Sequence, residues 1–289
     1  MSLGKRTQDV ANKLNVDTSE ELSELEEFSL VSKGKSSDKE VYEHNIESND
    51  ENVTIIPISD MHLGSTNSDL EKVELAADYI NNKDNCYTLV LGDAAETATK
   101  TSVGMGLFEE DMHLRNQIME LNRILSPLAD KGKLLGLHTG NHEFRSAVLT
   151  GLNPMEVLAG YLGVEYLGWQ AFHRINVGSN SYYIMSTHGV GSGQTTGSKV
   201  NNAEKPSNIA PTLDLYLSGH SHMKSVHTKE VYYIDEENNL QPKEQYYVIC
   251  GSFMKYFGGY AEMKVLPPTP TGFSRIELGV RNRYVAVTI

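Results

Sequence analysis

One stretch of the chain organises the rest, Val53-Thr54-Ile55-Ile56-Pro57-Ile58-Ser59-Asp60-Met61-His62. Residues 53–59 form a short and almost continuous apolar run, which predicts a buried β-strand. Asp60 and His62 follow this run directly. Because ligands of open α/β sheets gather beyond the carboxyl ends of the strands, we expect these two polar side chains to belong to a functional site.

The same arrangement repeats along the first half of the chain. Apolar periodicity predicts helices over residues 69–82 and 107–129, and apolar runs predict strands over residues 87–91 and 133–138. A polar string follows each strand, Gly92-Asp93 after the first and Gly140-Asn141-His142-Glu143 after the second. The sequence therefore predicts a sheet whose strands each deliver a polar string at their carboxyl end.

The second half of the chain has short connections and few helical patterns. Strands are predicted over residues 172–177, 182–186, 213–218, 226–234 and 244–250. Two further polar strings lie in this half, Thr187-His188-Gly189 and Gly219-His220-Ser221-His222. A second sheet packed against the first accounts for this pattern, and it predicts an α/β fold with a β-sandwich core and helices outside.

The polar strings together supply a mixed set of oxygen and nitrogen ligands. A single histidine in a loop is more often structural than metal-bound, but the set as a whole predicts a metal site. Carboxylate and amide oxygens mixed with imidazoles suit Mn, Fe or Zn, whereas oxygens alone favour Mg or Ca. The candidate metal ligands are Asp60, His62, Asp93, Asn141, His188, His220 and His222.

The order and completeness of these strings resemble the calcineurin-like metallophosphoesterase superfamily over residues 53–259. The resemblance implies a four-layer αββα sandwich of two mixed β-sheets flanked by helices. It also implies two divalent metal ions, for which we expect Mn, with Fe, Zn, Ni and Mg as alternatives. The expected reaction is hydrolysis of a phosphoester by a metal-bound hydroxide. By this resemblance one metal belongs to Asp60, His62 and His222, the other to Asn141, His188 and His220, and Asp93 bridges them.

The resemblance also assigns roles around Asn141. His142 occupies the position of a histidine that contacts the phosphate and protonates the leaving oxygen, and its unperturbed pKa near 6.5 suits a general acid. The expected catalytic residues are therefore His142 and Asp93, and the expected substrate-binding residues are Asn141 and Arg145. An ion pair with a surface carboxylate is the alternative for Arg145.

Details around the strings separate the branches of the superfamily. Protein Ser/Thr phosphatases carry arginines near them, whereas this chain has Ala94-Ala95-Glu96 after Asp93 and His138-Thr139 before Gly140, so phosphoproteins are disfavoured as substrates. The string Ser59-Asp60-Met61-His62-Leu63-Gly64 resembles the opening motif of Mre11/SbcD-type DNA-repair nucleases. This chain departs from them in carrying Glu143, where they usually have Asp, and in leaving no room for their long capping domain.

We therefore expect a phosphodiesterase, with a DNA exonuclease or endonuclease as the leading case. The alternatives are a phosphodiesterase or phosphatase acting on small nucleotides and a non-catalytic interaction module on the same fold. Residues 189–211, which include Lys199 and Lys205, are predicted to form a mobile loop over the metals that selects the substrate. Glu96 and Glu143 are candidates for orienting the ligand imidazoles, with a structural role as the alternative.

Other side chains are weaker candidates. A base-stacking rim is one interpretation of Tyr256, Phe257 and Tyr260, and ordinary packing is the alternative. His113 is the best histidine outside the strings, because it is expected on a helix that borders the site. The remaining histidines are interpreted as ordinary and are His44, His138, His173 and His227.

The N-terminal part of the chain differs in composition from the rest. The formal net charge is −13, and residues 1–51 hold 13 acidic and 6 basic residues. We expect an acidic helical segment with a linker over residues 1–51 and a catalytic domain over residues 52–289. Short helices are predicted over residues 7–16 and from Thr18 onward. The carboxylates of the second helix would repel DNA, so a protein partner is expected for this segment instead.

Two cysteines, Cys86 and Cys250, lie far apart in apolar, strand-like contexts. They predict buried free thiols and a reducing cytoplasm. No apolar run approaches the ~18 residues of a membrane helix, and the first residues lack the apolar stretch of a secretion signal. The sequence leaves the oligomeric state open.

Overall fold

The computed structural model describes residues 39–98, 111–191 and 193–289. The stretch quoted above forms strand β2, Asn52–Ile58. Val53 and Ile55 face one hydrophobic core, and Ile56 and Ile58 face another. A strand that is buried on both faces needs a near-continuous apolar sequence, and this explains the composition of the run.

Strand β2 lies in a six-stranded sheet, whose order within the described residues is β13-β12-β2-β3-β4-β5. The strands from β2 to β5 run parallel, and β12 and β13 complete the sheet in antiparallel pairing. The other strands of this sheet are β3 (Cys86–Val90), β4 (Leu134–His138), β5 (Tyr166–Gly168), β12 (Arg275–Gly279) and β13 (Val285–Thr288).

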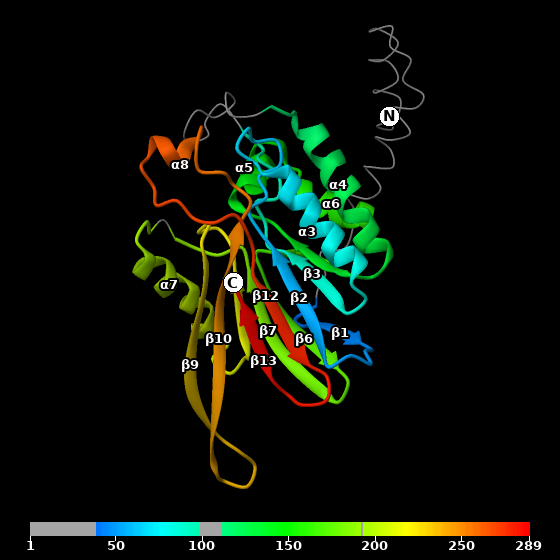
Figure 1. The fold of residues 1–289 in the computed structure, drawn as a ribbon, viewed down its shortest axis with the longest axis vertical. Coiled ribbons are helices and arrows are strands. Elements are labelled where there is room, and N and C mark those ends of the chain that lie inside the picture. The colour runs from blue at the N-terminus through cyan, green and yellow to red at the C-terminus, as the bar shows by residue number, and fades with distance from the viewer. Residues whose placement is uncertain (1–38, 99–110, 192) are drawn as a thin grey trace, which may run out of the picture.

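Helices cover the outer face of the six-stranded sheet (Figure 1). They are α3 (Leu70–Asn82), α4 (Leu114–Asp130) and α6 (Pro154–Leu162). Ile80 of α3, Leu121 of α4 and Leu158 of α6 pack into the same core as Ile58. Each helix thus buries one apolar stripe against the sheet. A further helix, α5 (Asn141–Thr150), begins just beyond the end of β4.

The second sheet has seven strands within the described residues, in the order β1-β6-β7-β8-β10-β11, with β9 paired to β10. Its strands β7, β8 and β10 run parallel to one another. The strands are β1 (Tyr42–Ile46), β6 (Gln170–Val177), β7 (Asn180–Thr187), β8 (Leu215–Ser218), β9 (Lys224–Ile234), β10 (Leu240–Ser252) and β11 (Gly272–Phe273). A short helix, α8 (Tyr260–Met263), lies between β10 and β11.

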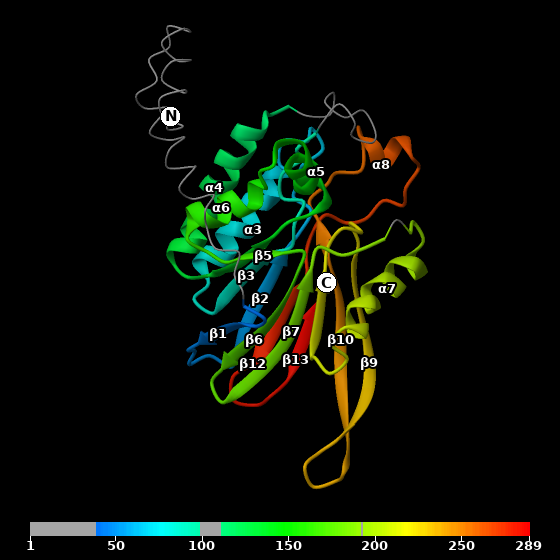
Figure 2. The ribbon, with the colours of Figure 1, turned by 180° about the vertical axis from the view of Figure 1, so that it is seen from behind.

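The two sheets pack face to face around a shared core. Ile55 and Leu89 from the first sheet meet Ile184 and Leu217 from the second in this core. On the other side of the second sheet, α7 (Thr196–Glu204) packs against β8 and β10 and continues into the 3₁₀ helix η2 (Lys205–Asn208). Figure 2 shows α7 on the side of the molecule opposite α3 and α4. The predicted four-layer αββα sandwich of two mixed sheets is therefore confirmed.

From residue 53 onward, the strands and helices predicted from the sequence are present among the described residues, with shifted ends in several cases. The helix predicted over 107–129 begins at Leu114, because His113 has extended backbone angles. Residues 107–110 lie outside the described residues. The helices α5 and α6 were missed, although the sequence carries their signals: the Asn153 side chain caps α6, and Pro154 occupies its first turn.

Two segment assignments need correction. Residues 42–46, assigned to the acidic helical segment and linker, form β1, which pairs in parallel with β6. The helices predicted over 7–16 and from Thr18 lie outside the described residues. Residues 189–211, predicted as a loop, contain α7 and η2, because the Thr195 side chain caps α7 by accepting from the Ser198 N–H.

Two other predictions concern the thiols and the membrane. Cys86 and Cys250 are buried and free, as predicted. Within the part of the chain that the structure describes, no helix is both long and apolar enough to cross a membrane.

Candidate metal centre

The carboxyl ends of the parallel strands meet at one edge of the sandwich. Asp60 and His62 follow β2, Asp93 follows β3 and Asn141 follows β4, while His188 follows β7 in the second sheet. The two sheets contact each other here, because the His188 Nδ1 atom lies 2.8 Å from the Leu91 carbonyl oxygen. The edge therefore gathers all the candidate ligands of both halves of the chain, including His220 and His222 beyond β8.

The backbone at this edge is held in an unusual conformation. Five of the candidate ligands have a positive φ angle, which side chains other than glycine rarely adopt. The angles are 52° at Asp60, 48° at His62, 47° at Asp93, 65° at His220 and 50° at His222. Such strain persists only where the surrounding structure imposes it, and it is concentrated at functional sites.

Asp60, His62 and His222 form a first group of facing ligand atoms. The Nε2 atoms of His62 and His222 lie 3.2 Å apart, and His222 Nε2 lies 3.2 Å from Asp60 Oδ1. The other ring nitrogen of His62, Nδ1, lies 2.8 Å from a carboxylate oxygen of Glu96. Because Nδ1–H donates to that carboxylate, the lone pair of His62 Nε2 is directed at the other two residues.

A second group is formed by Asn141, His188 and His220 around Asp93. The His188 Nε2 atom lies 3.0 Å from Asn141 Oδ1 and 3.2 Å from Asp93 Oδ2. His188 donates its Nδ1–H to the Leu91 carbonyl, so its Nε2 atom is the one that faces the group. His220 Nε2 lies 3.0 Å from the Gly191 carbonyl oxygen, which leaves Nδ1 to face the group.

Asp93 lies between the two groups. Its Oδ2 atom is 3.2 Å from His188 Nε2 on one side and 3.9 Å from His62 Nε2 on the other. Its Oδ1 atom accepts a hydrogen bond of 2.9 Å from the His142 backbone N–H. One carboxylate thus faces both sets of imidazoles.

The charges at the edge depend strongly on one another. Burial alone lowers the pKa of His188, but the Asp93 carboxylate outweighs burial and raises this pKa to about 10. Burial favours protonation of Asp93, but His188 and His142 hold its pKa well below the usual range. His222 likewise overcomes burial and lowers the pKa of Asp60 to about 2. Both aspartates are therefore ionised and attract cations.

Glu96 orients two histidines, which confirms the positioning role considered for it. Its carboxylate contacts Nδ1 of His62 at 2.8 Å and Nδ1 of His142 at 3.2 Å. The His142 Nδ1 atom also lies 2.9 Å from the Glu96 carbonyl oxygen and 2.7 Å from Arg145 Nη2. An Nδ1 proton satisfies the first of these contacts, and an Nδ1 lone pair satisfies the second. If His142 is protonated on both nitrogens, or is neutral with its one proton on Nε2, then Nε2–H points toward the centre.

Glu143 has the structural role that was the alternative for it, because its carboxylate bonds backbone N–H groups. Its carboxylate accepts the backbone N–H groups of Asp93, Ala95 and Gly140 at 2.8 to 3.1 Å. It therefore ties the loop after β3 to the start of α5. Burial and the nearby Asp93 charge raise the pKa of Glu143 to about 7.

Two glycines of the strings allow close approach to the carboxylates. A Cβ atom at Gly140 would lie 2.1 Å from Asp93 Oδ1, and one at Gly219 would lie 2.8 Å from Asp60 Oδ2. Both distances are far below van der Waals contact, so any other residue would displace an aspartate. These glycines thus belong to the site although they carry no ligand atom.

The side chains present fit a pair of divalent metal ions. Asp60 Oδ1 is buried and accepts no hydrogen bond from the described residues. It faces imidazole nitrogens whose lone pairs point toward it, and such acceptors repel one another unless a cation or a proton lies between them. Imidazole nitrogens with carboxylate and amide oxygens are the ligand set of Mn, Fe and Zn.

The remaining candidates from the sequence are His113, the aromatic residues Tyr256 and Phe257, and Arg145. His113 is exposed at the start of α4 and belongs to none of the facing ligand groups of the described residues. Tyr256 and Phe257 contact each other edge to face, and Phe257 is 77% exposed. Tyr256 and Phe257 remain candidates for a base-stacking rim. Arg145 is a neighbour of His142 and Glu96, so the alternative of an ion pair with a carboxylate is partly realised at 4.0 Å from Glu96.

Sequence reasoning missed several supporting residues. Gln117 of α4 accepts the Thr97 N–H, and Thr97 in turn donates its hydroxyl to the His142 carbonyl. No sequence signal marks these contacts, because they join segments far apart in the chain. Phe144 and Trp169 form an exposed aromatic pair with ring centroids 5.0 Å apart, and Phe144 lies only two residues after His142.

Comparisons with known proteins give structural likenesses only. No family model and no curated protein matches the chain. Among solved structures, a predicted phosphoesterase from Streptococcus pneumoniae is 13% identical, covering 82% of this chain and 88% of its own, with a TM-score of 0.37. Vps29 from Chaetomium thermophilum is 12% identical, covering 83% and 96%, with a TM-score of 0.40. A hypothetical protein from Pyrococcus horikoshii is 8% identical, covering 82% and 87%, with a TM-score of 0.39. Identities and TM-scores this low assign no function, so the αββα fold stands on the sheets and helices of the chain itself.

Proposed function

We propose that this protein is a metal-dependent phosphodiesterase with a two-metal centre at the strand edge. The position of Asp93 carries the proposal, because its Oδ2 atom faces both ligand groups, at 3.2 Å and 3.9 Å from an imidazole nitrogen of each. We expect Mn, with Fe, Zn, Ni and Mg as alternatives. In this proposal one metal belongs to Asp60, His62 and His222, the other to Asn141, His188 and His220, and Asp93 bridges them.

The metal pair and the protein side chains have separate tasks. When bound, two divalent ions supply a water nucleophile at neutral pH and offset the charge that develops on the phosphate oxygens. Glu96 holds His142 so that Nε2–H points toward the centre, where it can protonate the leaving oxygen. Transfer of this proton leaves Nδ1–H donated to Glu96. Arg145, beside His142, offers a guanidinium to a non-bridging phosphate oxygen.

Nucleic acid is the leading substrate class within this proposal. The opening string Ser59-Asp60-Met61-His62-Leu63-Gly64 supports a DNA exonuclease or endonuclease, because it resembles that of DNA-repair nucleases of the superfamily. Small nucleotides are the second candidate substrates. A non-catalytic interaction module would not need a proton donor, and the position of the His142 ring, with Nδ1 at Glu96 and Nε2 toward Asp93, therefore favours an enzyme.

The proposal also includes a cellular location and a protein partner. The buried free thiols of Cys86 and Cys250 support a reducing, cytoplasmic location. The acidic composition of residues 1–51 supports a protein partner for that segment.

Hydrolysis of bis-p-nitrophenyl phosphate with added Mn tests the activity. We expect turnover in wild type and none above background in Asp93→Asn. Absence of hydrolysis with every divalent metal, in protein shown by elemental analysis to hold two metals, would rule out catalysis. Degradation of single- and double-stranded DNA is then compared with that of cyclic nucleotides, using Asp93→Asn as the blank. DNA cleavage that is equal in wild type and blank would exclude the nuclease assignment.

The role of His142 is tested separately with His142→Ala. This variant should retain both metals yet lose turnover, most severely for diesters with a poor leaving group, because those depend most on protonation. Loss of metal from the variant would contradict the role of proton donor.

A further inference from the structure

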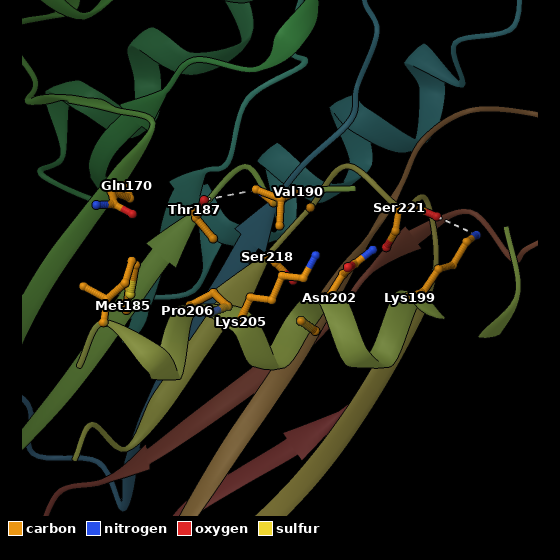
Figure 3. A pocket seen from close by; sticks show the side chains of 14 residues that line it. Gln170, Met185, Thr187, Val190, Lys199, Asn202, Lys205, Pro206, Ser218 and Ser221 are labelled. Atoms are coloured by element: carbon orange, nitrogen blue, oxygen red, sulfur yellow. Dashed lines mark hydrogen bonds between the residues drawn. The ribbon is translucent and has the colours of Figure 1, made fainter. Parts of the chain in front are cut away.

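A cavity of about 120 Å³ lies beside the metal centre, between α7 with η2 and the ends of β7 and β8 (Figure 3). Thr187 and Gly189 line it on either side of the candidate ligand His188. Gly219 and Ser221 line it on either side of His220. The cavity and the centre therefore share the same two loops.

The cavity is positively charged, in contrast to the chain as a whole. Its lining includes Lys199 and Lys205 but no acidic side chain, although the chain has a formal net charge of −13. Amide groups of Gln170 and Asn202 also line it. The apolar part of the wall comes from Met185, Val190, Ala203, Pro206 and Ile209. This combination suits a ligand that has both an anionic group and an apolar face.

Three polar side chains in the lining are not used by the protein itself. Gln170, Asn202 and Lys205 form no side-chain hydrogen bond or ion pair with any described residue. Asn202 and Lys205 extend from the α7 side toward the loops that hold Thr187 and Val190 (Figure 3). Donors that converge on a cavity without internal partners are available to a ligand.

The cavity wall also touches the loops of the centre directly. The Lys199 ammonium donates to the Ser221 carbonyl oxygen at 2.8 Å, between His220 and His222. The Gly191 carbonyl contacts His220 Nε2 at 3.0 Å, and a Cβ atom at Gly191 would lie 2.2 Å from the Asn202 amide. A group bound in the cavity would thus lie within one or two residues of the proposed ligands.

We propose that this cavity binds a second phosphate of the substrate, beside the scissile one, together with part of the sugar that carries it. The proposal rests on the proposed phosphodiesterase function and narrows its substrate class. The volume is too small for a whole drug-sized ligand, so the cavity takes one part of a longer substrate. Lys205 pairs with the second phosphate, the Asn202 amide bonds the adjoining sugar, and the apolar wall contacts the carbon atoms of that sugar.

Thymidine dinucleotides with and without a terminal phosphate test this proposal. We expect wild type to prefer the phosphorylated dinucleotide, with its phosphate at the 5′ or the 3′ end, by about tenfold in kcat/KM. Lys205→Ala should abolish this preference, and Asn202→Ala should raise KM for both dinucleotides. Lys83→Ala is the matched control, because Lys83 follows α3 and lies outside the cavity lining.

The outcomes separate this proposal from the proposed function. A wild type that cleaves both dinucleotides equally, or a preference that survives Lys205→Ala, would overturn the cavity proposal and leave the phosphodiesterase standing. If no dinucleotide is cleaved, calorimetric titration with the phosphorylated dinucleotide decides. Binding that Lys205→Ala weakens about tenfold would support the cavity while the proposed function fails. Failure of wild type to bind the dinucleotide would overturn the cavity proposal.

Discussion

Two groups of histidines in this protein differ in what their nitrogens face. At the strand edge, His62 and His188 face carboxylates and other lone pairs. Between the sheets, His44, His173 and His138 form an interior chain that includes the Ser186 hydroxyl. We call this second group the interior histidine chain.

The interior histidine chain is satisfied by neutral partners. His44 Nε2 lies 3.2 Å from His173 Nδ1, and the Ser186 hydroxyl lies 2.6 Å from His173 Nε2 and 2.7 Å from His138 Nε2. His138 Nδ1 then donates to the Gly168 carbonyl at 3.0 Å. With one proton on each ring and one on the hydroxyl, every donor in the chain has an acceptor. Both ring nitrogens of His138 and of His173 are thus used within the protein.

The pKa values follow from the partners. Burial lowers the pKa of His44 and of His138 to about 4, and that of His173 well below its ordinary value. At the strand edge, by contrast, Asp93 overcomes burial and raises the pKa of His188 to about 10. Burial also lowers the pKa of the candidate ligands His62 and His220. The direction of the pKa shift therefore does not distinguish a candidate ligand from a structural histidine, whereas the groups that its ring nitrogens face do.

The largest expected effect comes from the same substitution in the two groups. His188→Gln should lower kcat/KM at least about a hundredfold and remove one metal equivalent, because it deletes a proposed ligand. His173→Gln should keep both metals and the activity but lower the free energy of unfolding by about 1–3 kcal/mol, because buried hydrogen-bond partners are left unpaired. Activity assays, elemental analysis and urea unfolding measure the three quantities. Loss of metal from both variants would show that the two groups of histidines do not differ in metal binding.

A steric change at the strand edge should lower the activity nearly as much as His188→Gln does. Gly140→Ala places a methyl group 2.1 Å from Asp93 Oδ1, so the carboxylate proposed to bridge the metals must move, and activity should fall on the order of tenfold to a hundredfold. Gly197→Ala is the control, because its Cβ meets no atom within 4 Å and lies in α7. Steady-state kinetics at saturating Mn compares the two. If Gly140→Ala keeps the activity of the wild type, the position of Asp93 is not required for catalysis.

The smallest effect is the pH dependence of stability that the interior histidine chain confers. The unfolded chain binds protons near pH 6.5, whereas the folded chain excludes them from His44 and His138 until about pH 4. The unfolded state holds more protons in this window, so stability is full above about pH 6.5 and falls as the pH drops toward 4. The loss attributable to His138 is at most about 3 kcal/mol.

This slope is measured by urea unfolding of metal-free protein between pH 4 and 7. The groups that face the chain are Glu165 and Lys39 beside His44, and His188 beside His138. His44→Gln should flatten the slope relative to wild type, because it removes a histidine whose pKa burial lowers. Equal slopes in wild type and His44→Gln would refute the contribution of this histidine.

The sequence predicted the polar residues at the strand edge better than the contacts around them, and the reason is physical. The ligands follow strands that are apolar on both faces, so the strand ends and the strings could be located together, as at Asp60 and Asp93. Which imidazole faces which carboxylate depends on contacts between segments far apart in the chain. Glu96 with His62 and Glu143 with Asp93 are such contacts. The sequence proposed both glutamates for orienting imidazoles, with a structural role as the alternative, and only the contacts show that Glu96 has the first role and Glu143 the second.

The segment after His188 was the main error of interpretation. Its Gly, Ser, Thr and Asn content is typical of a loop, but Thr195 caps a helix and the resulting α7 packs on β8 and β10. The strand β1 was missed because it is short and lies in an acidic, polar stretch, and it is stabilised by pairing with β6. Tertiary packing overrode local composition in both cases.

The metal content of the purified chain, loaded with Mn and dialysed, tests most directly whether Asp93 joins two metal sites. Elemental analysis should find two Mn per wild-type chain and at most one in Asp93→Asn, with both proteins folded by circular dichroism. A folded wild-type chain that retains one metal or none, or an Asp93→Asn variant that retains two, would contradict a two-metal centre bridged by Asp93.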